Sequence, residues 1–244
     1  MKTLILIPSR LSATRLPRKP LLKINGLSII SHVFKKAVEA NIGEVYVAAE
    51  DQEIINDINK NGGQAILTSD THKTGTDRIH EALKKIGKTD IDLVMNLQGD
   101  EPLINVEDIR NLHEQMIKTN FEIGTLASKI FDKNSLKNKN VVKVITQESL
   151  DISKFPKAIN FTRKSNVPGE NVYHHLGIYC YRTESLIKFV SLKQTNNEVK
   201  NKLEQLRALD NNIQINVARA NSNPIGLDTQ EDFVAIKKIM EYKT

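Results

Sequence analysis

Leu4–Leu22, with the sequence LILIPSRLSATRLPRKPLL, is the stretch that decides the fold. Its apolar start, Leu4–Ile7, is followed by Pro8, which is typical of a short strand buried on both faces of a parallel sheet. Four cations follow within ten positions, namely Arg10, Arg15, Arg18 and Lys19. Open α/β sheets bind ligands at the carboxyl ends of their strands, so the sequence predicts an anionic ligand here. A solvated basic loop would give the same run of charges, and both readings stay open.

Helix-like and strand-like segments alternate from residue 27 to residue 118. The apolar spacing predicts helices at Leu27–Ala40, Gln52–Lys60, Asp77–Ile86 and Val106–Lys118, and strands at Glu44–Ala49, Gln64–Thr68 and Leu93–Leu97. Strands that alternate with helices at this spacing argue for βαβ units with right-handed crossovers. We therefore expect an α/β fold with a mainly parallel sheet.

The alternation stops after residue 120. Four β-like segments follow without a long helix between them, at Glu122–Ile130, Val141–Thr146, Ala158–Thr162 and Leu176–Arg182, with polar connections at 132–140 and 164–171. The chain then predicts a polar-faced helix at Asn196–Leu209, a strand at Gln214–Ala218 and a closing helix at Thr229–Glu241. We expect one domain whose parallel core, about residues 1–120 and 210–244, contains an inserted antiparallel, β-rich annex at about 121–209.

The composition restricts the class of protein. A chain of 244 residues can bury a sizeable core. Its net charge of +6 is compatible with nucleic acid, but aromatic residues make up 5% and no dense Lys/Arg block alternates with them. The charge therefore favours a phosphorylated small molecule at least as well. Cys180 is the single cysteine, which excludes an internal disulfide and fits a buried thiol. No apolar segment approaches the ~20 residues of a membrane span. We therefore expect a cytoplasmic protein.

The loop that follows the predicted strand Gln64–Thr68 carries polar groups suited to a nucleotide. The loop Thr68–Arg78 combines hydroxyls, a glycine and the start of a helix, which offer hydrogen bonds to a ligand. Thr76 as a helix cap and Gly75 as a turn residue would explain the same loop without a ligand. The cationic loop that follows Leu4–Ile7 lacks the Gly-x-x-x-x-Gly-Lys-Ser/Thr pattern of a P-loop.

Two carboxylates are candidates for a magnesium site. Asp100 follows the buried segment DLVMNL within Asn96–Pro102, and Asp228 follows the last β-like segment. Mg²⁺ prefers one or two carboxylates together with waters and phosphate oxygens, so both acids could approach one metal if these segments end side by side. As alternatives, Asp100 could stabilise a turn, and Asp228 or Thr229 could cap the final helix.

The histidines argue against zinc, because no His-Glu-x-x-His or comparable spacing is present. His174 or His175 could hydrogen-bond a ligand, although a structural histidine is the default for either. Glu204, Gln205 and Arg207 could form the polar side of an amphipathic helix or belong to a site.

Taken together, these segments resemble the 3-deoxy-manno-octulosonate (Kdo) cytidylyltransferases, also called CMP-Kdo synthetases. The matching motifs, in chain order, are Ile7–Arg10, Thr14–Pro17, Lys19–Leu21, Thr68–Ser69 to His72, Gly75–Arg78, Gln98–Pro102, His175–Tyr179 with Tyr181–Arg182, Leu203–Arg207 and Asp228–Thr229 with Glu231–Asp232. This ordered set covers nearly the whole chain. The resemblance implies a Rossmann-like, three-layer nucleotidyltransferase fold and a homodimer formed through the β-rich annex.

The resemblance also implies a reaction and roles for residues. The anomeric hydroxyl of Kdo would attack the α-phosphorus of CTP and give CMP-Kdo and pyrophosphate for lipopolysaccharide synthesis. The catalytic residues would be Arg10, Lys19, Asp100 and Asp228. Of these, Asp100 and Asp228 would bind Mg²⁺. Nucleotide binding would fall to Pro8, Ser9, Arg10, Lys19, Ser69, Gly75, Arg78 and Gln98. Sugar binding would fall to Arg15, Gln98, Arg163, His175, Tyr179, Glu204 and Gln205. Nucleotidyl transfer needs positioning and charge neutralisation, which such residues supply.

The chain departs from the family pattern at four positions. Arg18 stands where the family usually has glycine and would add a cation to the phosphate site, and Ala13 stands where it usually has serine. Asn160 replaces a tyrosine in the segment Asn160–Arg163, and Gln230 replaces a proline after Asp228-Thr229. These changes leave the nucleotide chemistry intact and bear on sugar recognition.

Other functions remain as alternatives. The same chemistry could act on an 8-amino analogue of Kdo or on a nonulosonic acid. A nucleotide-binding module without catalysis and a nucleic-acid-binding protein are alternatives from other classes. Retention of both Asp100 and Asp228 argues against a purely binding role, and the missing basic and aromatic face argues against nucleic acid.

Overall fold

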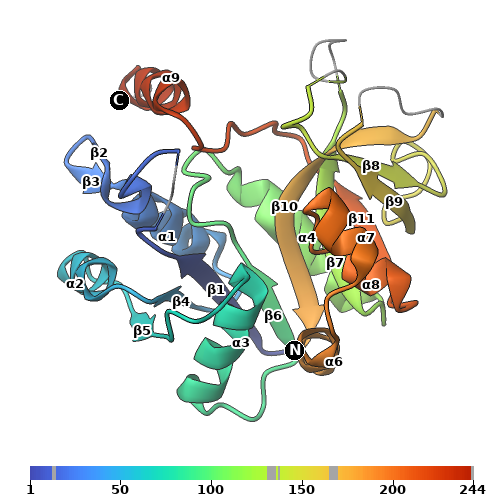
Figure 1. Ribbon diagram of the computed structural model, residues 1–244, viewed down its shortest axis with the longest axis horizontal. Helices are drawn as coiled ribbons and strands as arrows, with labels where there is room; N and C mark the ends of the chain where they lie inside the picture. Colours follow the sequence, from blue (N-terminus) through green and yellow to red (C-terminus); the bar gives the residue numbers. More distant parts are fainter. Residues whose placement is uncertain (13–14, 131–135, 137, 165–169, 243–244) are drawn as a thin grey trace. The chain divides into compact units, whose positions relative to one another are not determined.

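The strand that follows the amino terminus is the centre of the first part of the fold (Figure 1). A computed structural model describes residues 1–12, 15–130, 136, 138–164 and 170–242. The chain divides into two compact units, Met1–Ile109 with Pro224–Thr244 and Arg110–Asn223, and the boundary falls within helix α4 (Val106–Lys118). Ala13 and Thr14, which the sequence comparison singled out, and most of the two polar connections lie outside the described residues.

The first unit contains a parallel sheet with the strand order β6-β1-β4-β5. Its strands are β1 (Thr3–Ser9), β4 (Glu44–Ala49), β5 (Ala65–Leu67) and β6 (Leu93–Asn96). Ile5 of β1 lies opposite Val45 on one side and Met95 on the other. Leu4–Ile7 are fully buried, as expected for an inner strand with both faces covered. The predicted parallel sheet is confirmed.

Most helices of this unit start at a side-chain cap. They are α1 (Ile29–Ala40), α2 (Gln52–Lys60), α3 (Gly75–Ile86) and α9 (Gln230–Glu241), of which the first three contact the sheet. Ser28 and Thr74 accept hydrogen bonds from the backbone N–H groups of Ser31 and Asp77. The alternative in which Thr76 caps this helix is therefore wrong: Thr74 is the cap, and α3 begins at Gly75, two residues before the predicted start at Asp77. Similarly, α1 begins at Ile29 and not at Leu27.

The shift at Leu27 has a local cause. Two-residue strands β2 (Lys23–Ile24) and β3 (Leu27–Ser28) form a hairpin, in which Leu27 pairs with Ile24. Asn25 and Gly26 between them both have positive φ angles, of 50° and 78°. A two-residue turn of this kind favours Asn-Gly, so Leu27 and Ser28 belong to the hairpin and α1 begins after them.

The second unit contains mostly antiparallel strands. β10 (Val172–Arg182) pairs antiparallel with β7 (Ile123–Ser128) and β8 (Lys143–Thr146), and β8 pairs antiparallel with β9 (Ala158–Thr162). β11 (Ile215–Arg219) pairs with β7 in parallel. The expected antiparallel strands are therefore present. None of the helices in the described part of the chain is long and apolar enough to cross a membrane.

One predicted helix of this unit is wrong, and one observed helix was not predicted. The predicted helix Asn196–Leu209 is two short helices, α7 (Asn196–Asn201) and α8 (Leu206–Asp210), because Lys202 takes a left-handed conformation with φ 53°. Arg207, one of the candidates for the polar side of that helix, is buried, and its Nε and Nη2 atoms donate to Glu198 at 2.9 and 2.6 Å. Helix α6 (Thr183–Ser191) was not predicted, and its amino terminus has no side-chain cap to announce it.

Candidate active site

The cationic loop after β1 is tied to the acidic end of β4. Asp51 accepts a hydrogen bond from the Leu11 N–H at 2.8 Å, and Glu50 accepts one from Ser12 Oγ at 3.3 Å. Asp51 stands at the N-cap of α2 but makes no cap hydrogen bond to that helix. Its carboxylate therefore fixes the loop instead of the helix.

Arg18 is turned toward the same acidic segment. Both of its terminal nitrogens pair with Glu53 of α2, which raises the pKa of Arg18 and lowers the pKa of Glu53. Arg18 is not among the residues that line the cavity described below, so the geometry gives no support to the expectation that it adds a cation to the phosphate site. Its backbone has φ 57°, the left-handed region that a glycine would adopt without strain.

A buried cluster brings the two ends of the first unit together. Leu16 of the loop, Ile24, Ile29 and the C-terminal residues Leu227 and Ile236 form this cluster. Burial of Leu16 and Leu227 places their chain neighbours in contact: Arg15 Nη2 lies 3.0 Å from Asp228 Oδ2. Apolar packing therefore positions a charged pair that is 213 residues apart in the sequence (228 − 15).

The loop after β6 supplies the second carboxylate. Its backbone is joined to the C-terminal segment by the hydrogen bond from Leu227 N–H to Asp100 O, at 2.9 Å. Gly99 allows close approach to β1, because a Cβ atom there would lie 2.9 Å from the Pro8 carbonyl oxygen and from Ile30. Asp100 thus faces the start of the short helix η1 (Lys19–Leu21).

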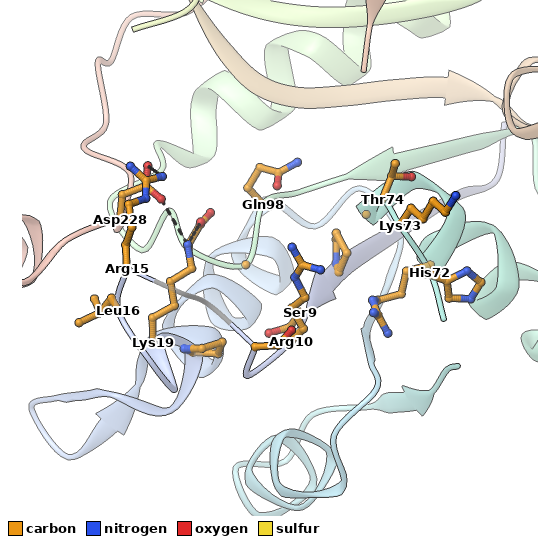
Figure 2. A pocket seen from close by; sticks show the side chains of 17 residues that line it. Ser9, Arg10, Arg15, Leu16, Lys19, His72, Lys73, Thr74, Gln98 and Asp228 are labelled. Carbon is orange, nitrogen blue, oxygen red and sulfur yellow. Dashed lines mark hydrogen bonds and ion pairs between the residues drawn. The ribbon is translucent and has the colours of Figure 1, made fainter. Parts of the chain in front are cut away.

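Lys19 joins the two carboxylates (Figure 2). Its Nζ atom pairs with Asp100 Oδ2, donates to the Leu227 carbonyl at 2.9 Å and lies 3.6 Å from Asp228 Oδ1. The side chain of Lys19 is 17% exposed, so these contacts are only partly screened by water. The cap of α9 is Thr229, with Asp232 completing a capping box, which answers the alternative in which Asp228 caps the helix.

These residues line a cavity of about 400 Å³, which is the size of a small-molecule site. Its walls come from the loops after β1, β5 and β6 and from the segment before α9, and they include Pro8, Ser9, Arg10, Arg15, Lys19, Gly75, Arg78, Gln98, Asp100 and Asp228. Ser69 is not one of the lining residues. Ser12, Leu16, Lys73 and Thr74 also line the cavity, although the sequence assigned them no role there. Leu16 lies within the Thr14–Pro17 motif, and Lys73 and Thr74 lie within the Thr68–Arg78 loop, so only Ser12 belonged to neither.

The wall formed by Thr68–Arg78 is held by buried charge. Arg78 is 3% exposed; its Nη1 donates to Thr68 Oγ1 at 2.7 Å and to Ser69 O at 3.1 Å, and its Nη2 pairs with Glu50. Burial raises the pKa of Glu81, but hydrogen bonds from Lys85, Ser69 N–H and His72 lower it to about 2. This carboxylate therefore remains ionised and anchors the loop at neutral pH.

The cluster around Lys19 has the donor set of a hard-cation site. Two carboxylates and one carbonyl, all oxygen ligands, already surround a single positive charge. Across the described residues, no group of three or more His, Cys, Asp or Glu side chains could hold a metal ion by itself. Asp100 and Asp228 could thus hold Mg²⁺ with waters and a nucleotide phosphate as the remaining ligands.

Glu101 is a neighbouring acid that the sequence gave no reason to single out. Its Oε2 atom is buried without a hydrogen-bond partner among the described residues. Burial and the adjacent Asp100 raise its pKa to about 8, with Lys19 acting in the opposite direction. Glu101 is thus mostly protonated at neutral pH, and the carboxylate charges of this corner are those of Asp100 and Asp228.

Five of the predicted sugar-binding residues belong to the second unit, namely Arg163, His175, Tyr179, Glu204 and Gln205. The His175 ring lies 4.9 Å from the Phe161 ring and 5.5 Å from the Tyr179 ring, and its Nε2 lies 3.0 Å from Thr125 Oγ1. Burial, and then His174 and Arg163, lower the pKa of His175 to about 3, and burial raises that of Tyr179 well above 10. Both side chains are therefore neutral at pH 7.

The first strand of the parallel sheet runs into a cationic loop, and carboxylates from other segments close this loop. This arrangement places the chain among the nucleotidyltransferases. Comparison with known proteins refines this class. Residues 4–215 match the family model described as cytidylyltransferase. The chain belongs to this family and, within it, to the 3-deoxy-manno-octulosonate cytidylyltransferases, as its motifs indicated.

The similarity extends over the full length. The 3-deoxy-manno-octulosonate cytidylyltransferase of Afipia carboxidovorans is 42% identical, over 98% of this chain and 96% of the relative. That of Rhodopseudomonas palustris strain BisB18 is 41% identical, over 99% and 98%. A solved CMP:2-keto-3-deoxy-manno-octonic acid synthetase complexed with CTP is 31% identical, with a TM-score of 0.90 and complete coverage of both chains. A 4-diphosphocytidyl-2C-methyl-D-erythritol synthase from Anaerococcus prevotii, 15% identical with a TM-score of 0.66 over 98% of this chain and 99% of that one, shares the fold alone.

Proposed function

We propose that this protein transfers the cytidylyl group of CTP to the anomeric hydroxyl of Kdo, giving CMP-Kdo and pyrophosphate. One observation carries the proposal: a single cavity combines the cations Arg10, Arg15 and Lys19 with the carboxylates Asp100 and Asp228. A triphosphate needs positive charge along its length, and a divalent cation needs the carboxylates. Membership of the 3-deoxy-manno-octulosonate cytidylyltransferases supports the choice of both substrates.

The protein's part in the reaction is positioning and charge neutralisation. Arg10 grips phosphate oxygens two at a time through its planar guanidinium, and Lys19 supplies a compact charge on a flexible stem. The attacking hydroxyl forms a bond to the α-phosphorus as the bond to pyrophosphate breaks, and its proton passes to solvent. Asp100 and Asp228 would hold Mg²⁺, which when bound polarises the phosphoryl oxygens and stabilises the leaving pyrophosphate.

The remaining cavity residues orient the nucleotide. Pro8, Ser9 and Gln98 lie at strand ends beside the cations, and Gly75 and Arg78 lie on the wall that Glu50 and Glu81 fix. Ser69 acts through this wall, because its backbone N–H donates to Glu81 at 2.9 Å and its carbonyl accepts from Arg78. A wall held by the buried Arg78–Glu50 pair and by the hydrogen bonds of Glu81 is preorganised for the ligand.

Recognition of Kdo is assigned to Arg15 and Gln98 in the cavity and to Arg163, His175, Tyr179, Glu204 and Gln205 in the second unit. Arg163 can pair with the carboxylate of an acid sugar. His175 and Tyr179 are neutral at pH 7 and can hydrogen-bond hydroxyl groups without adding charge. We further propose a cytoplasmic homodimer that supplies CMP-Kdo for lipopolysaccharide synthesis.

Pyrophosphate release with a panel of sugars tests the proposal. CTP and Mg²⁺ are incubated with the enzyme and with Kdo, its 8-amino analogue or a nonulosonic acid, and each reaction is repeated with UTP. We expect the highest kcat/KM for CTP with Kdo. Faster release with another acid sugar would reassign the acceptor, and no release with any sugar would leave a nucleotide-binding module. Light scattering of the purified protein in solution distinguishes the mass of one chain from the mass of two chains, which tests the proposed homodimer.

A further inference from the structure

The observed position of Lys19 differs from the position that its role in the proposed function requires. It is assigned to the triphosphate of CTP, yet its ammonium group contacts the two carboxylates assigned to the metal. The same Nζ atom also donates to the Leu227 carbonyl at 2.9 Å, so three oxygen atoms surround it. Lys19 therefore occupies the position that a cation bound to these oxygens would take.

The local charges balance in this arrangement. Asp100 pairs with Lys19, and Asp228 pairs with Arg15 at 3.0 Å while lying 3.6 Å from Lys19. Two carboxylates thus face two cations. A divalent ion that arrives alone meets a neutralised site and must also displace an ammonium group.

CTP changes this balance because it carries several negative charges. The triphosphate offers Lys19 and Arg15 new anionic partners, and a lysine can follow them because its charge sits on a flexible stem of four carbons. When Lys19 leaves Asp100, the carboxylates lose their partner at the same moment that phosphate oxygens become available as further metal ligands.

We infer that Lys19 is an internal counter-cation, which holds Asp100 and Asp228 before substrate binds and makes entry of the divalent cation depend on the nucleotide. The inference rests on the proposed metal assignment and goes beyond it, since it gives Lys19 a role in the order of binding. Lys19 acts here as a positioning residue for the metal site in addition to its contact with the triphosphate.

Binding of Mn²⁺, used as the probe for the divalent ion, tests the inference without turnover. Electron paramagnetic resonance of free Mn²⁺ and calorimetry measure its affinity for the full chain, with and without a non-hydrolysable CTP analogue. Wild-type protein should bind Mn²⁺ weakly alone. Lys19→Met, which keeps the stem and removes the charge, should bind it about tenfold more tightly in the absence of nucleotide. Lys19→Gln serves as a second variant if the first does not fold.

Lys73→Met is the matched control, because Lys73 lines the same cavity but lies well away from Lys19 and Asp228 (Figure 2). It removes one positive charge from the cavity and should leave the Mn²⁺ affinity within about twofold of wild type, since solvent screens the longer distance. An equal gain in Lys73→Met, or no gain in both Lys19 variants, would overturn the inference.

A separate arm distinguishes this outcome from failure of the metal assignment. With the CTP analogue present, Mn²⁺ should bind to wild type and not to Asp100→Asn. If it binds both equally, the carboxylate is not a metal ligand and the proposed function loses its metal site. If it binds only wild type, while the Lys19 variants show no gain without nucleotide, the metal site stands and the counter-cation role is wrong.

Discussion

Asp51 stands at the N-cap of α2 but gives its hydrogen bond to the Leu11 backbone N–H, at 2.8 Å, instead of to its own helix. An N-cap side chain is typically worth about 1 kcal/mol to a helix, so this diversion leaves part of the helix's stabilisation unused. The carboxylate fixes the start of the cationic loop, whose far end carries Arg15 and Lys19. We therefore expect the position of these cations to depend in part on an acid outside the cavity.

Replacing Asp51 by serine separates the two roles. A serine hydroxyl can cap α2 but is too short to reach Leu11, so we expect unchanged or slightly higher thermal stability together with a several-fold higher KM for CTP. Steady-state kinetics and thermal unfolding measure the two effects. Asp51→Asn, which keeps an acceptor oxygen of the same reach, is the control and should retain most of the CTP affinity. A parallel fall of stability and kcat in Asp51→Ser would mean that Asp51 is only structural.

Arg18→Gly should leave catalysis intact. A non-glycine residue in the left-handed region costs roughly 1–2 kcal/mol. The ion pair of Arg18 with Glu53 is exposed and screened by solvent, so its loss should cost little stability. We therefore expect equal or slightly greater stability, measured by urea unfolding, and an unchanged KM for CTP. Glu53→Gln removes the ion pair alone and isolates its share. A raised KM in Arg18→Gly would show that this cation reaches the triphosphate.

His175 predicts a specific pH dependence of stability. Its pKa is lowered to about 3 in the folded protein by burial, against about 6.5 when unfolded, so the unfolded state binds the extra proton between these values. Its contribution is complete above pH 6.5 and is lost as the pH falls toward 3. We expect His175→Gln to reduce the slope of unfolding free energy against pH in this window by up to about 1.4 kcal/mol per pH unit. An unchanged slope would contradict the buried, neutral histidine.

Lys19→Ala should impair use of CTP rather than use of the sugar. Its ammonium group is assigned to the triphosphate, so its loss should raise the KM for CTP and lower kcat/KM for that substrate. Both substrates are varied in turn under saturating Mg²⁺. Lys73→Ala, from the same cavity, provides the comparison for loss of one charge. An isolated rise in the KM for the sugar would contradict the assignment.

Local patterns predicted most of the first unit. The apolar run Leu4–Ile7 is the fully buried strand that its composition indicated, and the predicted bounds of α2 and α4 are those observed. Errors arose at a short hairpin and at a buried ion pair. Asn25 and Gly26 form a hairpin that delays α1, and the polar sequence at Glu198 and Arg207 forms a buried ion pair between two helices, where periodicity predicted one exposed helix.

The candidate site could be predicted only as separate segments. Sequence motifs identified Lys19, Asp100 and Asp228, but their meeting depends on burial of Leu16 with Leu227 and on the close approach at Gly99. No local pattern reports such long-range contacts. The same holds for Arg18, whose charge suggested a phosphate contact and whose partner is Glu53.

Formation of the product tests the central claim most directly. Phosphorus NMR of wild type with CTP, Mg²⁺ and Kdo should show the phosphodiester of CMP-Kdo together with pyrophosphate. Asp100→Asn, which removes one carboxylate charge at nearly constant size, should keep its fold by circular dichroism and give no product. Absence of CMP-Kdo with wild type, or near-normal formation with Asp100→Asn, would contradict the assignment of this cavity to cytidylyl transfer.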